Sequence, residues 1–165
     1  MGNTQVFCLM FSFLSMIFDV KWEKVPNCWN LCGMLTVLVL YEKEWNMLLG
    51  TLLPFLILFP LFLCKMIGTG DIKVFMVLGC AMGMEKVFLC MVYSFLIGAC
   101  ISLPILIFRC DVRQRFTYFF SYLHTVFITK TVPPYLAPGI HPENIHFTIP
   151  IFCSVVLLIA KGGYL

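Results

Sequence analysis

Two carboxylates, Asp19 and Asp71, are candidates for chemistry because each borders an apolar segment of a very hydrophobic chain. Asp19 begins the stretch DVKWEKVPN, and Asp71 lies in the stretch MIGTGDIKVF. Two aspartates that share one proton cannot both ionise, so the acidic one polarises a scissile carbonyl while the ionised one deprotonates a water molecule. Such a pair hydrolyses an amide bond without a metal ion or a covalent nucleophile, and its two titrations belong to the pair.

Each aspartate also has a purely structural interpretation. Asp19 could be a helix-end charge at the membrane surface, paired with Lys21 or Lys24, and Asp71 could cap a helix that begins near Ile72. The catalytic interpretation gains weight from the cost of an ionisable group at the centre of a membrane helix, which is at least ~2.5 kcal/mol on insertion scales. Both carboxylates also fall on the same predicted side of the membrane.

The elements that must position these carboxylates are membrane helices. Of the 165 residues, 61% are hydrophobic and only 12% are charged, well beyond the roughly half-apolar composition of a soluble domain. The apolar segments lack the alternation of barrel strands, and they cover residues 5–18, 28–40, 47–63, 74–84, 87–108 and 147–160. We therefore predict an all-α membrane protein, a polytopic bundle of about six transmembrane helices forming a single domain over residues 1–165.

Several of these segments are shorter than the roughly 20 residues that cross a bilayer unaided, so their helices should extend into the flanking polar residues. Before the last of them, RFTYFFSYLHTVFI (residues 115–128) predicts an interfacial or re-entrant helix on the cytoplasmic side. The stretch TVPPYLAPGIHPEN that follows contains four prolines and predicts a loop. If residues 116–128 crossed the membrane instead, the last helix would change direction, but Asp19 and Asp71 would remain on one side.

The distribution of Lys and Arg sets the predicted orientation, because cytoplasmic loops of membrane proteins are enriched in both. With six spans, one side carries Lys21, Lys24, Lys65, Lys73, Arg109, Arg113, Arg115 and Lys130, and the other carries Lys43, Lys86 and Lys161. The first side is therefore predicted to be cytoplasmic, which places both aspartates at the cytoplasmic ends of helices in the plasma membrane. MGNTQVF has no basic segment, so we do not expect a secretory signal peptide.

Other kinds of chemistry have weak support. The net charge of +3 comes from scattered basic residues that form no stripe for nucleic acid. There is no HExxH, GxSxG or CxxC string, and His124, His141 and His146 lack metal-ligand spacing. Cys28 and Cys32 share a helix face, which is a weak metal signal. We therefore expect no cofactor and no nucleic-acid partner.

Two stretches resemble motifs of the type IV prepilin peptidases, which are membrane aspartyl proteases of the GxGD class. DVKWEKVPN is similar to a motif of an aspartate, a basic residue and a hydrophobic-Pro-Asn triplet, and GTGDIK matches GxGDxK. The residues that carry the two motifs are Asp19, Lys21, Pro26, Asn27, Gly68, Gly70, Asp71 and Lys73. NIHFTIPIFCSVV is similar to the last helix of the family, although His146-Phe147 stands where many members have Pro-Phe.

This resemblance implies that Asp19 and Asp71 form a catalytic dyad at the cytoplasmic membrane face. Family substrates are pilin-like or flagellin-like precursors, cut after a short basic leader that precedes a hydrophobic helix. The chain lacks the family's N-terminal extension with paired CxxC motifs, which implies a short member that acts only as a peptidase. Beside the aspartates, Gly68 and Gly70 would allow positive φ or close backbone approach and leave room for a peptide. Lys21, Lys24 and Lys73 could lower the pKa values of the dyad or attract anionic lipid.

A non-enzymatic interpretation also exists, in which a small transporter or assembly subunit uses the same carboxylates to relay protons or bind a cation. Two features oppose it. Both carboxylates are predicted at the cytoplasmic ends of helices rather than at the midplane of the membrane, and the sequence has no visible inverted repeat.

Overall fold

The computed structural model describes residues 2–40, 45–63, 67–109 and 146–162, together with Thr117, Phe120, Ser121, His124, Thr125 and Ile128. The helices with defined bounds are α1 (Asn3–Trp22), α2 (Asn27–Leu40), α3 (Trp45–Leu63), α4 (Thr69–Met82), α5 (Met84–Arg109) and α7 (Thr148–Ala160). Every apolar segment singled out in the sequence is helical, and the described residues contain no strand. The predicted all-α membrane class is therefore confirmed.

At the ends that carry the two aspartates, the helices extend beyond the apolar segments, as predicted. The first helix, α1, continues past its apolar part through Asp19 to Trp22, and it ends where Glu23 adopts a left-handed backbone conformation with φ of 53°. The amide of Glu23 donates a hydrogen bond to the Asp19 carbonyl at 2.8 Å. Helix α4 begins at Thr69, so its first turn contains Asp71. Both candidate carboxylates thus lie on helical turns rather than in loops.

Among the described residues, three helices are long and apolar enough to cross a membrane. They are α1, α3 and the Met84–Pro104 part of α5. Two further apolar helices, Asn27–Val39 and Thr148–Ala160, are shorter. Three of the six predicted spans therefore have the required length, and α2, α4 and α7 are shorter than a full membrane crossing.

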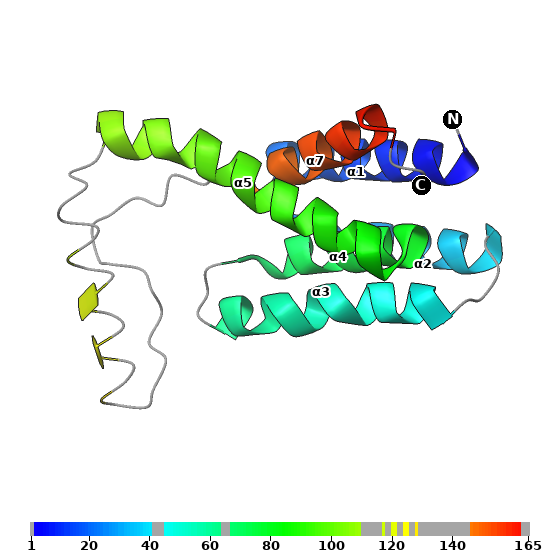
Figure 1. Cartoon of the computed structure of the whole chain (residues 1–165), viewed down its shortest axis with the longest axis horizontal. Coiled ribbons are helices and arrows are strands. Elements are labelled where there is room, and N and C mark those ends of the chain that lie inside the picture. Colours follow the sequence, from blue (N-terminus) through cyan, green and yellow to red (C-terminus); the bar gives the residue numbers. More distant parts are fainter. Residues whose placement is uncertain are drawn as a thin grey trace.

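Helix α4 occupies the centre of the bundle, where it packs against α1, α2, α3 and α5. Figure 1 shows α1 and α7 side by side, α3 running along α4, and α5 crossing between these two pairs. Most of α4 beyond its first turn is buried, including Val74, Phe75 and Leu78. The outer helices instead expose large apolar side chains such as Leu31, Leu56 and Leu96, as expected for surfaces that face lipid.

The contact between α3 and α4 depends on two glycines. A Cβ atom built on Gly79 would collide with the backbone carbonyl oxygen of Gly50, and one built on Gly50 would collide with that of Gly79. Small residues at such a crossing let two helix backbones approach closely, which is common in membrane bundles. This close approach helps to fix α4, and with it Asp71.

The segment before α7 is described only in part. Thr117, Phe120, Ser121, His124, Thr125 and Ile128 are helical. The helical conformation at these positions agrees with the predicted helical character of the segment. The rest of the predicted interfacial helix and the proline-rich loop lie outside the described residues, as do Lys43, Lys65, Arg113, Arg115 and Lys130.

Candidate active site

One end of the bundle brings together the helix ends that carry the sequence motifs. Helix α1 ends there, and α4 and α7 begin there (Figure 1). The last turn of α1 carries Asp19 and the first turn of α4 carries Asp71. The short connection after α1 leads into α2, which begins at Asn27. Residues far apart in the sequence therefore meet at this end.

Asp19 and Asp71 line the same pocket, which has a volume of about 480 Å³. The pocket is lined by Asp19, Glu23, Lys24, Val25, Asn27, Gly68, Thr69, Gly70 and Asp71. Its walls therefore come from the two stretches that the sequence singled out, DVKWEKVPN and GTGDIK. Among its described lining residues, three carry a carboxyl group and one, Lys24, carries an ammonium group.

Asp71 is half-buried at the start of α4. Burial raises the pKa of Asp71 from its ordinary value of 3.8 to about 7, and the nearby charge of Asp19 adds to the rise. The backbone of Gly68 and the side chain of His146 act in the opposite direction, but their effect is smaller. A substantial fraction of Asp71 is consequently protonated near neutral pH, as a carboxylic acid that polarises a carbonyl must be.

Asp19 is held from the opposite side by the start of α7. The hydroxyl of Thr148 donates a hydrogen bond to Oδ2 of Asp19 at 2.8 Å. The Nδ1 atom of His146 lies 3.3 Å from the same oxygen. Thr148 is buried, whereas the side chain of His146 is 26% exposed. The two aspartates thus share a pocket but have different partners.

The two motif glycines matter for the room that their missing side chains leave, and neither adopts an unusual backbone conformation. Gly68 has a φ of −74° and Gly70 lies within α4, so the positive φ that the sequence allowed is not used at either position. A Cβ atom on Gly68 would lie 3.3 Å from Oδ2 of Asp71, which is a crowded contact, whereas one on Gly70 would lie 3.7 Å from Cβ of Val25, an ordinary contact. Gly68 therefore leaves room for the Asp71 carboxylate.

Comparison with known families decides which class of protein this chain represents. The sequence model of the type IV leader peptidase family matches residues 6–103, more than half of the chain, and this range contains both aspartates. The chain belongs to the type IV leader peptidase family. No curated protein and no solved structure matches the chain.

Membership of the type IV leader peptidase family implies a membrane peptidase that acts on prepilin-type substrates in general. This agrees with the family expected from the two motifs. The match ends in α5, so α7, with Thr148, and the preceding His146 come from outside the matched range. Among the described residues, no group of three or more His, Cys, Asp or Glu side chains is placed to hold a metal ion.

In this leader peptidase, the remaining motif residues connect the two stretches. Nζ of Lys73, on α4, donates a hydrogen bond to Oδ1 of Asn27 at 2.6 Å. The carbonyl of Pro26 accepts hydrogen bonds from the amides of Trp29 and Asn30 at 3.1 and 3.4 Å, which starts α2. Lys73 therefore links α4 to the first residue of α2.

The two lysines of the first motif stretch, Lys21 and Lys24, differ in their distance from the pocket. The ammonium group of Lys21 lies over the ring of Trp22, 5.1 Å from its centroid, and the side chain is exposed. Lys24 is also exposed, but it lines the pocket. Lys21 is therefore exposed and does not line the pocket, whereas Lys24 is close enough to affect the charge of the pocket.

His146 and Thr148 are the site residues that the motif analysis missed as partners of Asp19. The signal was the stretch NIHFTIPIFCSVV, whose similarity to the last family helix indicated a position but gave these side chains no role. Thr148 and Asp19, for example, are 129 residues apart in the sequence. Only the packing of α7 against α1 brings them together.

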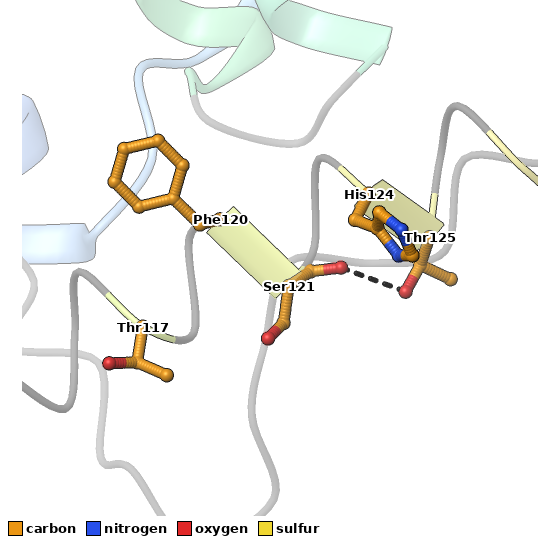
Figure 2. A pocket seen from close by; sticks show the side chains of 5 residues that line it. All are labelled: Thr117, Phe120, Ser121, His124 and Thr125. Atoms are coloured by element: carbon orange, nitrogen blue, oxygen red, sulfur yellow. Dashed lines mark hydrogen bonds between the residues drawn. The ribbon is translucent and has the colours of Figure 1, made fainter.

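A second cavity, of about 630 Å³, lies at the partly described segment before α7. Its described lining residues are Thr117, Phe120, Ser121, His124 and Thr125 (Figure 2). The hydroxyl of Thr125 donates a hydrogen bond to the carbonyl of Ser121 at 2.8 Å, as is common for threonine within a helix. None of these residues belongs to the two motifs, so this cavity is separate from the aspartate pocket.

Proposed function

We propose that this chain is an aspartyl endopeptidase that removes the leader peptide from type IV pilin-like or flagellin-like precursors at the cytoplasmic membrane face. Asp19 and Asp71 are the proposed catalytic dyad. The observation that carries the proposal is the shared pocket of the two carboxylates, one of which has a pKa near neutrality. The family supports the general class of leader peptidase.

The proposed reaction needs only a water molecule and the one proton that the pair shares. The ionised carboxylate takes a proton from water while the water oxygen bonds to the scissile carbonyl carbon, and the protonated carboxyl gives its proton to the carbonyl oxygen. A tetrahedral diol results. When it collapses, the first carboxyl protonates the leaving amide nitrogen, the C–N bond breaks, and the second carboxylate recovers a proton from a diol hydroxyl. The pair returns to its starting state.

The charges of the pocket support a basic leader as the bound segment. Among its described lining residues, Asp19, Glu23 and Asp71 are acidic and Lys24 is basic. The exposed apolar faces of the neighbouring helices support a substrate whose mature part is a hydrophobic helix, because such a helix can lie in the bilayer beside the bundle. Its leader then emerges at the depth of the helix ends, where the pocket opens.

The proposed location is the plasma membrane, crossed several times, with the pocket facing the cytoplasm. Lys21, Lys24 and Lys73 lie near the pocket, which supports this orientation because positive residues accumulate on the cytoplasmic side. Anionic lipid at that surface is a further proposed contact. Packing of α7 against α1 and α5 supports a single domain over residues 1–165.

Cleavage of a co-expressed pilin-like precursor tests this function. The wild type is compared with Asp19→Asn and Asp71→Asn, which keep the shape of each side chain but cannot ionise, and the amount of each variant in the membrane is measured. We expect both variants to lose the shorter product at unchanged abundance, with a rate decrease of at least about a hundredfold. Full cleavage by either variant would remove that aspartate from the proposed dyad. Lys161→Gln, which removes a charge just after the end of α7 and outside both motifs, is the control, and it should keep its activity.

A further inference from the structure

The two aspartates of the pocket are held by different elements. Oδ2 of Asp19 faces two side chains from the beginning of α7, while Asp71 rests against Gly68 within its own helix turn. We propose that His146 and Thr148 are positioning residues that hold Asp19 as the ionised, proton-accepting member of the pair, which leaves Asp71 to carry the shared proton. This proposal rests on the proposed peptidase function and adds a division of roles to it.

The position of Thr148 supports a permanent hydrogen bond. Its side chain is only 1% exposed, so its hydroxyl has little access to water as a partner. A buried hydroxyl without a partner is costly, and the carboxylate oxygen 2.8 Å away satisfies it. A hydrogen bond donated to a carboxylate favours the charged form of that carboxylate.

His146 approaches the same oxygen from the residues just before α7. Its Nδ1 atom lies 3.3 Å from Oδ2 of Asp19, and a protonated imidazole at this distance attracts the carboxylate charge. Because the Thr148 hydroxyl donates to Oδ2 and the His146 ring lies against the same oxygen, a proton on that oxygen would face both side chains. Oδ1 remains as the oxygen that accepts the proton of the attacking water.

Other charged groups near Asp19 do not explain this arrangement. Glu23 and Lys24, which follow α1, and Asp71 from α4 all line the pocket. Lys73 of α4 is engaged with Asn27. All four groups are retained when Thr148 or His146 is changed. A difference between Thr148→Val and the wild type therefore reports the contact with Asp19, whereas His146→Gln also removes a group that acts on Asp71.

The experiment measures kcat/KM for cleavage of a purified pilin-like precursor as a function of pH, in detergent or lipid vesicles. The full-length wild type is compared with Thr148→Val, which keeps the shape but removes the hydroxyl, and with Thr148→Ser, which keeps the hydroxyl. His146→Gln removes the imidazole at a partly exposed position. The acid limb of the kcat/KM profile reports the ionisation of the essential base in the free enzyme.

We expect the acid limb of Thr148→Val to move to higher pH by about one unit, because a hydrogen bond to a charged group is lost. Thr148→Ser should stay close to the wild type, and His146→Gln should shift in the same direction as Thr148→Val. The precursor's KM should change little in all of them. If Thr148 and His146 had only a structural role, their variants would lose activity equally at every pH, and Thr148→Ser would lose as much as Thr148→Val.

Unchanged acid limbs in both Thr148→Val and His146→Gln would overturn the proposal, as would an equal loss in Thr148→Val and Thr148→Ser. If Thr148→Val fails to accumulate in the membrane, the His146→Gln profile decides between the outcomes. Failure of the peptidase function itself looks different, because then the wild type does not cleave or the aspartate variants do. If the wild type cleaves and needs both aspartates, but neither Thr148→Val nor His146→Gln shifts the acid limb, only the positioning role is refuted.

Discussion

Nζ of Lys73 donates a hydrogen bond to Oδ1 of Asn27 over 2.6 Å, and this contact joins the two motifs of the pocket. Lys73 lies two residues after Asp71 on α4, and Asn27 is the first residue of α2. The connection between α1 and α2, which supplies Glu23, Lys24 and Val25 to the pocket, is thereby held against the start of α4. A lysine in GxGDxK therefore has a structural explanation that needs no direct part in the reaction.

Loss of the Lys73 contact should weaken the peptidase without abolishing it. Lys73→Met keeps the aliphatic stem, and we expect cleavage to fall roughly two- to fivefold because one exposed polar contact is worth up to about 1 kcal/mol. Asn27→Leu removes the other partner. The double variant should be no worse than the more damaging single variant, as measured by a double-mutant cycle on kcat/KM. Fully additive losses would show that the two residues act independently.

The pH dependence of cleavage should have an alkaline limb close to neutrality. Burial, together with the charge of Asp19, raises the pKa of Asp71 to about 7, so its protonated form disappears above this pH. We expect kcat/KM to fall by about tenfold per pH unit once the pH is well above 7. The precursor should contain no group that titrates between pH 6 and 9, so that the limb of the profile reports the enzyme alone. A flat profile over that range would mean that the acid of the reaction is not Asp71.

The same pKa predicts the effect of pH on folding stability. The folded-state pKa of Asp71 lies above its ordinary value of 3.8, so the folded protein holds this proton more tightly than the unfolded chain. The stability that comes from Asp71 is full below about pH 4 and is lost as the pH rises towards and through 7. Asp71→Asn resembles the protonated form, so this variant should melt at a higher temperature than the wild type at pH 8.

Thermal unfolding of detergent-solubilised protein at pH 5 and pH 8 measures this effect without any substrate. The difference in melting temperature between Asp71→Asn and the wild type should be several degrees larger at pH 8 than at pH 5. Glu23→Gln, a change of another carboxyl in the pocket, is the control. An equal effect of Asp71→Asn at both pH values would contradict the raised pKa.

The crossing of α3 and α4 should be very sensitive to a single added methyl group. In Gly79→Ala the new Cβ meets the carbonyl oxygen of Gly50, and a backbone atom cannot move aside as a side chain can. We expect a loss of roughly 1–3 kcal/mol of stability, or more if the helices separate. In Gly98→Ala the nearest atom is Cε2 of Phe147 at 3.2 Å, so this matched control should be milder. Thermal unfolding of the two variants compares them directly.

The helices of this chain could be predicted from its sequence because the apolar segments dominate it. The segments at 47–63 and 87–108, for example, became α3 and α5 with small changes at their ends. The start of α4 was harder to predict, because the apolar pattern begins only at Val74 while the helix begins at Thr69. The capping position of Gly68 and the polar first turn carry no hydrophobic signal.

The two aspartates were also visible in the sequence, since a carboxylate beside an apolar segment is unusual and both lie in recognisable motifs. The structure adds their partners. No sequence pattern marks His146 or Thr148 as a partner of Asp19, because this contact depends on how α7 packs against α1. Such contacts between distant residues leave no local pattern. The role of Lys73 as a partner of Asn27 was hidden for the same reason.

The two glycines of the GTGD stretch should differ in their tolerance of alanine. In Gly68→Ala the new Cβ would lie 3.3 Å from Oδ2 of Asp71, so the carboxylate must move away from its position in the pocket. In Gly70→Ala the nearest atom is Cβ of Val25 at 3.7 Å, which is an ordinary contact. A shift of a few tenths of an ångström in a reacting group lowers the rate, so we expect Gly68→Ala to cleave several-fold more slowly than the wild type.

Gly70→Ala should retain most of its cleavage activity, because neither the backbone nor the carboxylate has to move. Both variants should accumulate and melt like the wild type, since Gly68 is exposed and neither glycine uses a positive φ. Initial cleavage rates at equal enzyme concentration compare the pair. Equal activity of Gly68→Ala and Gly70→Ala would show that the space beside Asp71 is not what the first glycine provides. A larger loss in Gly70→Ala would instead point to the contact between α4 and Val25 as the more sensitive part of the pocket.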